Sequence, residues 1–166
     1  MRIIFVRHGE PDYGLDCLTP AGRQQAAGAA ERLLREGITA VYASPMGRAR
    51  ETASFTAARL GLPVQTLEFM HEVSWGGPGV PEDGHPWTLA DRMIAEEDFD
   101  FRARDWRRHR YFAQNSVTAD YDRVSACFDS FLLGHGYRHE GGRFFCRAEE
   151  SETFAVFSHG GSDSVL

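Results

Sequence analysis

The first 67 residues of this chain alternate short apolar runs with longer segments of mixed polarity. The run at 3–6 is rich in β-branched side chains, which is typical of a strand buried on both faces of a parallel sheet. The three runs that we expect to form strands are 3–6, 38–43 and 64–67. Strand, helix, strand, helix, strand at this spacing predicts a parallel α/β sheet with right-handed crossovers.

The two segments between these runs carry helix boundary signals. Thr19-Pro20 and Ser44-Pro45 each place a capping hydroxyl directly before a proline, the residue favoured at the first helical position. Gly37 and Gly61 stand where each helix would close. We therefore expect helices from Pro20 to about residue 36 and from Pro45 to about residue 60.

The pattern changes after Glu72. A loop rich in Gly and Pro at 75–84 precedes an aromatic and charged segment at 85–114, which we expect to be helical because so many aromatic side chains need packing partners. A helix at 119–133, a hairpin at 137–147 turning at Gly141-Gly142, and a buried strand at 153–157 should follow. The sequence stops at Leu166, shortly after the start of another expected helix. This predicts one domain over 1–166 whose C-terminal part is missing.

Composition narrows the class of protein. With 166 residues, 42% hydrophobic and 25% charged, the chain fits a soluble globular domain. The net charge of −6 argues against a nucleic-acid partner. No apolar stretch has the length of a membrane span or signal peptide, so we expect no membrane association and a cytoplasmic location. Cys17, Cys127 and Cys146 are widely spaced and should be reduced thiols.

Two of the expected strands end in a histidine followed by glycine. Arg7-His8-Gly9-Glu10 follows the first strand, and Ser158-His159-Gly160-Gly161 follows the last. Ligands bind at the carboxyl ends of strands in open α/β sheets. A histidine there can act as nucleophile or base, and an arginine beside it can bind an anion. Arg48, in the first turn of the second helix, adds a further cation, so we expect an anion site rather than two histidines satisfied in loops.

Five segments in this order resemble the histidine phosphatase superfamily, the phosphoglycerate-mutase-like proteins. They are Arg7-His8-Gly9-Glu10; Leu18-Thr19-Pro20 with Gly22 and Gln25-Ala26; Ser44-Pro45 with Arg48-Ala49 and Thr52-Ala53; Glu72 in His71-Glu72-Val73; and Ser158-His159-Gly160-Gly161. The resemblance implies a three-layer α/β/α fold with a mainly parallel central sheet. It also implies a helical cap insertion, which would lie at about 76–147.

The resemblance further implies a phosphatase acting on a small phosphorylated metabolite. His8 would attack phosphorus and become a phosphohistidine. Glu72 would protonate the leaving oxygen and then activate the water that cleaves the intermediate. His159 would complete the catalytic set. The groups expected to hold the phosphoryl oxygens are Arg7, Arg48, His159 and the backbone near Gly161.

Alternatives stay open at this point. Many superfamily members carry asparagine where this chain has Gly14, as part of the phosphate cradle, so that contact is not carried over. Mutase-type phosphoryl transfer and a non-catalytic phospho-ligand binder of the same fold are the other functions considered. Hydrolysis is preferred because mutases of this family are usually longer and carry further substrate motifs. A homodimer is compatible with the sequence.

No metal or cofactor is expected. His8, Asp12, Glu72 and His159 could in principle converge on an ion, but the cationic groups already supply the positive charge that phosphate needs. His71 to Trp75 begins like a zinc-protease motif and lacks its second histidine. The ligand-like spacing of His135 and His139 is interrupted by glycine, which disfavours a helix there.

Overall fold

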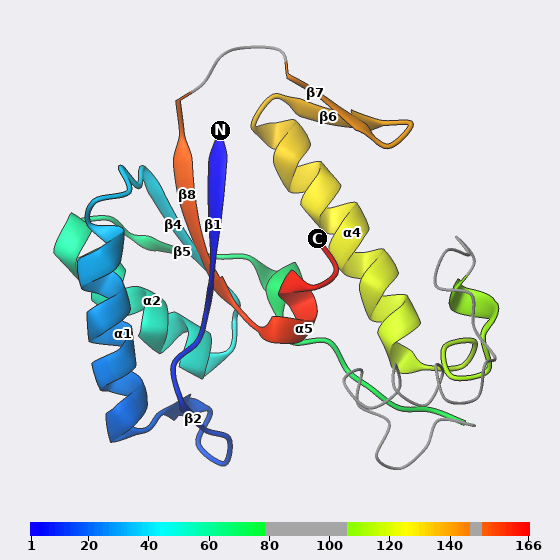
Figure 1. Ribbon diagram of the computed structural model, residues 1–166, viewed down its shortest axis with the longest axis horizontal. Helices are drawn as coiled ribbons and strands as arrows, with labels where there is room; N and C mark the ends of the chain where they lie inside the picture. The colour runs from blue at the N-terminus through cyan, green and yellow to red at the C-terminus, as the bar shows by residue number, and fades with distance from the viewer. Residues whose placement is uncertain (79–105, 147–150) are drawn as a thin grey trace. The chain divides into compact units, whose positions relative to one another are not determined.

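The computed structural model describes residues 1–78, 106–146 and 151–166, and Figure 1 labels their helices and strands. These residues form two compact units, which are described separately. The first combines Met1–Glu72 with Val124–Leu166, and the second is Val73–Arg123. The insertion expected at about 76–147 lies partly outside the described residues, as does most of its aromatic segment.

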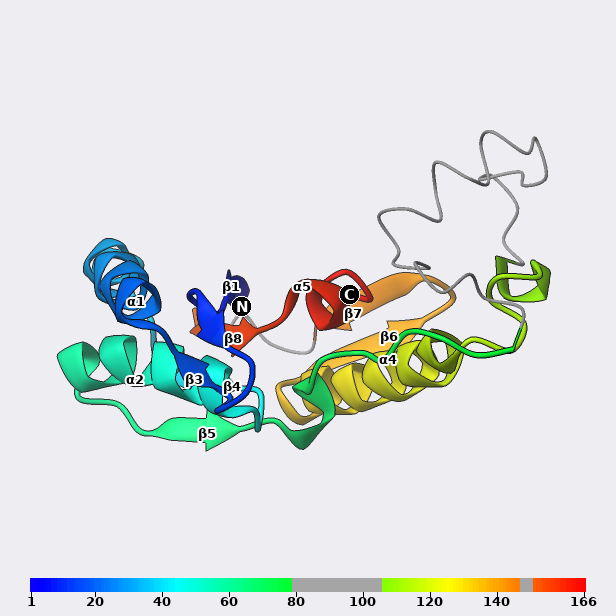
Figure 2. The ribbon, with the colours of Figure 1, turned by 90° about the horizontal axis from the view of Figure 1, so that it is seen from below.

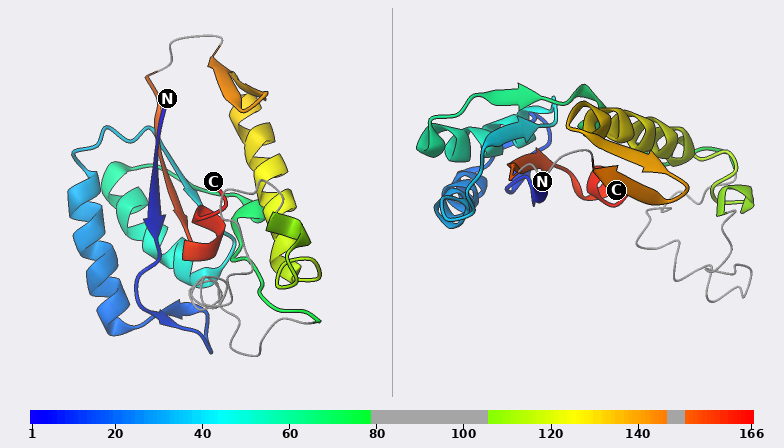
Figure 3. Two further views of the ribbon diagram at one scale, coloured as in Figure 1. Left: turned by 45° about the vertical axis from the view of Figure 1, so that its right-hand side comes forward. Right: turned by 90° about the horizontal axis from the view of Figure 1, so that it is seen from above.

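The first unit is built on a four-stranded parallel sheet. Its strands are β1 (Arg2–Arg7), β8 (Thr153–Ser158), β4 (Ala40–Ala43) and β5 (Val64–Thr66), in that order across the sheet. All three neighbouring pairs are parallel, as the sequence predicts. Figure 3 shows β1 and β8 running side by side in the same direction. The carboxyl ends of all four strands therefore meet at one edge of the sheet.

The two strands that are directly followed by a histidine, β1 and β8, differ in burial. All six residues of β8 are buried, as expected for a strand with neighbours on both sides. The prediction that 3–6 is buried on both faces is wrong, since β1 is only partly covered and Phe5 is 38% exposed. β1 pairs only with β8 in the described sheet, so its other side has no strand against it.

Helices cover both faces of this sheet and make the three layers. α1 (Pro20–Leu33) and α2 (Gly47–Leu60) lie side by side (Figures 1 and 2) and pack on one face. The core there contains Leu33, Ile38, Val41, Ala43, Ala53, Ala57, Ala155 and Phe157. On the other face, rings from the C-terminal half of α4 (Ser116–Gly134) meet rings of the sheet. Phe131 lies 5.1 Å from Tyr42 and Phe128 lies 6.1 Å from Phe5, between ring centroids.

The helix ends agree with the sequence signals only in part. The Thr19 hydroxyl accepts a hydrogen bond from the Gly22 N–H at 3.0 Å, and Gly61 closes α2 at φ 67°, both as predicted. However, α1 ends at Leu33 rather than near Gly37. α2 begins at Gly47 with Met46 as its N-cap, so the cap predicted at Ser44 is wrong. The Ser44 hydroxyl has another partner, described below.

Short elements connect these layers. The loop after β1 forms a small antiparallel pair, β2 (Pro11–Asp12) with β3 (Cys17–Leu18). The turn η1 (Glu68–Met70) precedes Glu72, and α5 (Gly160–Asp163) follows β8. The predicted hairpin is present as β6 (Tyr137–Glu140) and β7 (Arg143–Cys146), with positive φ at both glycines of its turn.

The second unit begins with the segment after Glu72 and includes the start of α4. Asn115 is buried, and its Oδ1 accepts the Gly76 N–H at 3.1 Å. Asp120 accepts hydrogen bonds from both the backbone and the hydroxyl of Ser74. The turn η2 (Trp106–Arg108) packs on α4 through Trp106 and Tyr121. No helix among the described residues is both long and apolar enough to span a membrane.

Candidate active site

The pairing of β1 with β8 brings the two histidines together. Arg7 pairs with Ser158, so His8 and His159 both leave the sheet one residue later at the same edge. Their ring centroids lie 5.2 Å apart. His8 is 8% exposed and His159 is completely buried. Two residues from opposite ends of the chain thus form one cluster, as the sequence predicts.

The contacts of His8 fix which ring nitrogen carries the proton. Its Nδ1 lies 2.7 Å from the Gly9 carbonyl oxygen, which can only accept a hydrogen bond. Nδ1 is therefore the protonated nitrogen, and Nε2 keeps its lone pair. Burial lowers the pKa of His8, and the charges of Arg48 and Arg7 act in the same direction. A neutral imidazole with a free Nε2 is the form that can act as a nucleophile.

The His159 ring is held in place by a hydrogen bond with the Ser44 hydroxyl. The Ser44 Oγ lies 2.8 Å from His159 Nε2 and also accepts the Met46 N–H at 3.3 Å. Burial lowers the pKa of His159 to about 3, helped by the charges of Arg48 and His8. Its other nitrogen, Nδ1, is buried and has no hydrogen-bond partner among the described residues. A buried polar atom of this kind is unusual in a folded protein and indicates a place for a ligand group.

Arg48 comes from the first turn of α2, as expected, and is 5% exposed. One terminal nitrogen donates to Asp16 Oδ1 at 2.6 Å and the other lies 3.3 Å from the Met46 sulfur. Its Nε is buried and has no partner in the part of the chain that the structure describes. Because a buried guanidinium normally uses all its donors, this unused donor is available to an anion.

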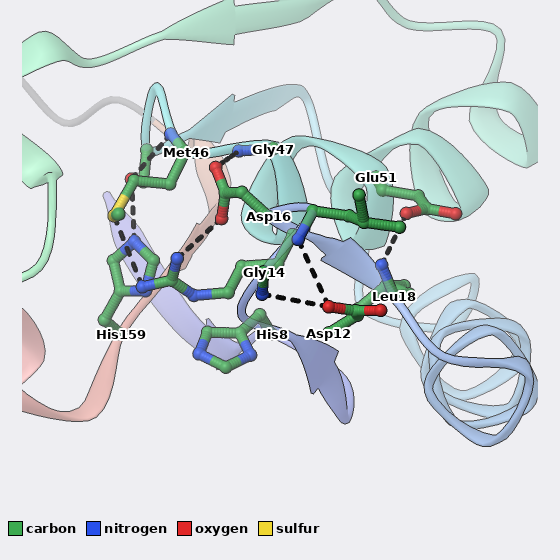
Figure 4. A network of polar contacts seen from close by, with 12 residues as sticks. His8, Asp12, Gly14, Asp16, Leu18, Met46, Gly47, Glu51 and His159 are labelled. Atoms are coloured by element: carbon green, nitrogen blue, oxygen red, sulfur yellow. Dashed lines mark hydrogen bonds and ion pairs between the residues drawn. The ribbon is translucent and has the colours of Figure 1, made fainter.

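Asp16 is a site residue that sequence reasoning missed. Figure 4 shows it between the start of α2 and the two histidines. Its second oxygen, Oδ2, accepts the Gly47 N–H at 2.6 Å. Although partial burial opposes it, the Gly47 N–H and the Arg48 guanidinium hold the pKa of Asp16 below its usual value. The loop around it is closed by Asp12, whose Oδ1 accepts the N–H groups of Gly14 and Leu15. The Gly14 N–H is thus used within the loop.

Glu72 is bound to the segment that follows His159. The Ser162 N–H donates to Glu72 Oε1 at 3.2 Å. The next residue, Asp163, accepts a hydrogen bond from the Ser158 hydroxyl. Burial raises the pKa of Asp163 to about 6, and the nearby Glu72 charge adds to the increase. The sequence predicted neither contact, since Ser44 was expected to cap α2 and Asp163 belongs to none of the five matched segments.

The remaining predicted residues lie at the same sheet edge. Arg7 is exposed at the end of β1, and its charge acts on both His8 and Asp163. Gly161 is buried in α5, directly before Ser162. Among residues 1–78, 106–146 and 151–166, no group of three His, Cys, Asp or Glu side chains is placed to hold a metal ion. His135 and His139 belong to different surroundings, since His135 packs on Phe154 and His139 stacks on Phe144.

The site thus combines a buried histidine pair and a buried arginine at the carboxyl edge of a parallel α/β sheet. The sequence profile of the histidine phosphatase superfamily (branch 1) matches residues 3–166, and the chain belongs to this superfamily. This confirms the family resemblance that the five sequence segments indicate.

Curated relatives carry mutase names. The chain is 46% identical to phosphoglycerate mutase-like protein 4 of Arabidopsis thaliana over 69 residues, covering 36% of this chain and 30% of that protein. It is 29% identical to the probable phosphoglycerate mutase GpmB of Escherichia coli over 147 residues, covering 78% of this chain and 62% of that protein. The chain therefore spans less than two thirds of the length of these relatives.

Solved structures with the same fold include several phosphatases. Mycobacterial glucosyl-3-phosphoglycerate phosphatase superposes with a TM-score of 0.61 at 23% identity, covering 98% of this chain and 75% of that one. Phosphoserine phosphatase from Entamoeba histolytica gives 0.58 at 24% identity, covering 98% and 76%. The alpha-ribazole phosphatase from Shigella flexneri gives 0.59 at 23% identity, covering 99% and 76%. At these identities the likeness establishes the fold, a parallel α/β sheet with helices.

Proposed function

We propose that this protein is a phosphatase that hydrolyses a small phosphomonoester through a phosphohistidine on His8. The observation that carries the proposal is a pair of buried polar atoms, Arg48 Nε and His159 Nδ1, that have no hydrogen-bond partner among the described residues and lie beside a histidine whose Nε2 keeps its lone pair. These three groups suit a phosphoryl group, whose oxygens accept hydrogen bonds while its phosphorus is attacked. The phosphatase names of three structural neighbours support hydrolysis.

The reaction proceeds in two displacements. In the first, the lone pair of His8 Nε2 forms a bond to phosphorus as the ester P–O bond breaks. Glu72, in its protonated form, gives its proton to the leaving oxygen, and the alcohol departs. In the second, the Glu72 carboxylate takes a proton from water, whose oxygen bonds to phosphorus while the N–P bond breaks. Inorganic phosphate leaves, and His8 and Glu72 return to their starting forms.

The cations at the sheet edge stabilise charge during both steps. Arg48 and Arg7 already act electrostatically on His8 in the free protein. A dianionic phosphoryl group between them would reverse their effect on the imidazoles, since an anion favours the protonated form. His159, neutral in the free protein, would then be able to donate through Nδ1 to a phosphoryl oxygen. Its Ser44 contact keeps the ring in place for this purpose.

Trapping the phosphoenzyme tests the proposal. Rapid quenching without acid after mixing with a labelled aryl phosphate should give an acid-labile phosphoprotein in the wild type, and His8→Ala should abolish both label and turnover. Glu72→Gln should lower turnover by about a hundred- to ten-thousand-fold with a poor leaving group. With nitrophenolate, a good leaving group, the rate of His8 phosphorylation should fall less. Label should accumulate in this variant because the second step lacks its base. Equal losses with both leaving groups and no accumulation would remove Glu72 from the mechanism.

Mutase-type transfer is the second candidate, favoured by the names of the curated relatives. It uses the same phosphohistidine but passes the phosphoryl group to a second hydroxyl instead of water. Incubation with a phosphoglycerate separates the two functions, because hydrolysis releases inorganic phosphate and transfer yields an isomer with no phosphate released. Vanadate binding without either product would instead identify a non-catalytic binder of phosphorylated ligands.

A further inference from the structure

Asp16 uses its two carboxylate oxygens on two consecutive residues. Oδ1 accepts from the Arg48 guanidinium and Oδ2 accepts from the Gly47 N–H, each at 2.6 Å. The bond from the Gly47 N–H fixes the carboxylate relative to the backbone at the start of α2. The bond from Arg48 then fixes the end of the long, flexible arginine side chain relative to that same backbone. Arg48 is therefore oriented at both ends.

The backbone on both sides of the Asp16–Gly47 contact has a conformation that few residue types can adopt. Asp16 has φ 48°, a left-handed conformation that is unfavourable for most residues with a side chain. A Cβ on Gly47 would lie 2.1 Å from the Asp16 carbonyl oxygen, so only glycine allows the loop to approach α2 this closely. A left-handed residue and an obligatory glycine on the two sides of one contact indicate that the contact itself matters.

We propose that Asp16 is a positioning residue that holds the Arg48 guanidinium in the orientation needed to bind a phosphoryl group. The inference rests on the proposed function, because it assigns Arg48 to the phosphoryl site. With one terminal nitrogen held by Asp16 and the other against Met46, Nε is the guanidinium nitrogen that has no hydrogen-bond partner among the described residues, so its N–H can donate to the ligand. Asp16 would touch the guanidinium and not the substrate.

Two effects of the Asp16 charge on anion binding oppose each other. A carboxylate near the site repels phosphate, which would make its removal favourable. Its side chain is 40% exposed, however, so solvent screens this repulsion. The Arg48 side chain is only 6% exposed, so a lost charge-assisted hydrogen bond there is not replaced by water. We expect the loss of orientation to dominate.

Glu51 provides a matched control in the same region. Its Oε2 accepts the Leu18 N–H at 2.7 Å and its Oε1 accepts from Arg23 Nε at 2.6 Å. It thus anchors the far end of the same loop to α2 and α1 with the same kind of contacts, but it binds a different arginine. If Asp16 merely anchors the loop, replacing Glu51 should have a similar effect on anion binding.

The experiment measures vanadate affinity and steady-state turnover of an aryl phosphate in Asp16→Asn, Glu51→Gln, Arg48→Lys and the Asp16→Asn/Arg48→Lys double variant. Asparagine tolerates the left-handed backbone. We expect Asp16→Asn to weaken vanadate binding about tenfold, which is about 1.4 kcal/mol, and Glu51→Gln to leave it unchanged. Asp16→Asn should add nothing in the Arg48→Lys background, because its effect passes through the guanidinium.

The outcomes separate this inference from the proposed function. Vanadate binding by Asp16→Asn at wild-type affinity or tighter, or equal losses in Asp16→Asn and Glu51→Gln, would overturn the positioning role while leaving the phosphatase intact. A wild type that neither binds vanadate nor turns over the ester would overturn both. If Asp16→Asn does not fold, Asp16→Gly replaces it, since glycine removes the backbone cost at φ 48° and the same comparisons apply.

Discussion

Two groups at the ends of α5, the buried His159 before its first residue and the partly buried Asp163 as its last, should give the protein opposite responses to acid. His159 and Asp163 are four residues apart, and the Asp163 N–H donates to the His159 carbonyl. Burial lowers the pKa of the first to about 3 and raises that of the second to about 6. Each group therefore binds protons differently in the folded and unfolded protein, which couples the free energy of unfolding to pH.

For His159 the unfolded protein holds the extra proton. Between an unfolded pKa of 6.5 and a folded value of about 3, stability is lost as the pH falls. Each pH unit costs about 1.4 kcal/mol, so acidification from pH 6.5 to about 4.5 removes roughly 2.7 kcal/mol. The side chain is completely buried, so solvent screening does not reduce this value. His8, with its own lowered pKa, acts in the same direction.

For Asp163 the folded protein holds the extra proton. Between a folded pKa of about 6 and an unfolded value of 3.8, stability is gained as the pH falls. Acidification from pH 6 to about 4.5 should add roughly 2 kcal/mol. The slopes of His159 and Asp163 are equal and opposite over this window. Their contributions should nearly cancel in the wild type, leaving mainly the slope of His8.

Single substitutions should expose the two contributions. His159→Gln removes one of the groups that penalise acid, so the free energy of unfolding should change more favourably from pH 6 to about 4.5 than it does in the wild type. Asp163→Asn removes the group whose protonation stabilises the folded protein in acid, so the free energy of unfolding should fall over the same pH interval. The two changes should differ by about 4 kcal/mol, measured by urea unfolding at several pH values. The series stops at about pH 4.5 because Asp16, Glu36, Glu51 and Asp120, whose pKa values are lowered in the folded protein, add their own loss of stability as the pH falls further.

The comparison of slopes carries the test, because either substitution also changes stability at neutral pH. Charged neighbours of His159 are Arg48, His8, Asp16 and His71, and those of Asp163 are Glu72 and Arg7. None of these side chains is replaced in the two variants. If wild type and both variants gave parallel curves between pH 6 and 4.5, neither group would have the protonation that its shifted pKa implies.

Three further outcomes are expected. Gly22→Ala should lower the free energy of unfolding in urea by about 1–3 kcal/mol, because the new Cβ would lie 2.1 Å from the Glu10 carbonyl oxygen. Gly28→Ala, in the same helix and with no described atom within 4 Å of the new Cβ, should raise it by roughly 0.5–1 kcal/mol. Thr19→Ala should cost about 1 kcal/mol through loss of the cap on α1, and an unchanged midpoint would contradict that role. Turnover of an aryl phosphate should survive dialysis against chelator, and activity restored only by a divalent metal would refute this.

The order of the elements and the ends of β1 and β8 could be read from the sequence because local signals determine them. Apolar composition placed both strands, but it could not distinguish an edge strand from a central one, so the burial of β1 was predicted wrongly. A Ser-Pro pair usually starts a helix, yet the Ser44 hydroxyl bonds to His159, 115 residues away. Asp16 left no signal, since its contacts with Gly47 and Arg48 join residues more than 30 positions apart.

The pairing of β1 with β8 also determines when the site can exist. His8 is synthesised long before β8 and His159, which follow much later in the chain. Until β8 forms and inserts between β1 and β4, the first strand has no sheet partner among the described elements. A slip of one residue in this pairing would displace one histidine by about 3.3 Å and turn its side chain to the opposite face. Under the proposed function, phosphoenzyme formation would therefore report that this late strand has inserted in the correct register, and it would serve to follow the completion of folding on or off the ribosome.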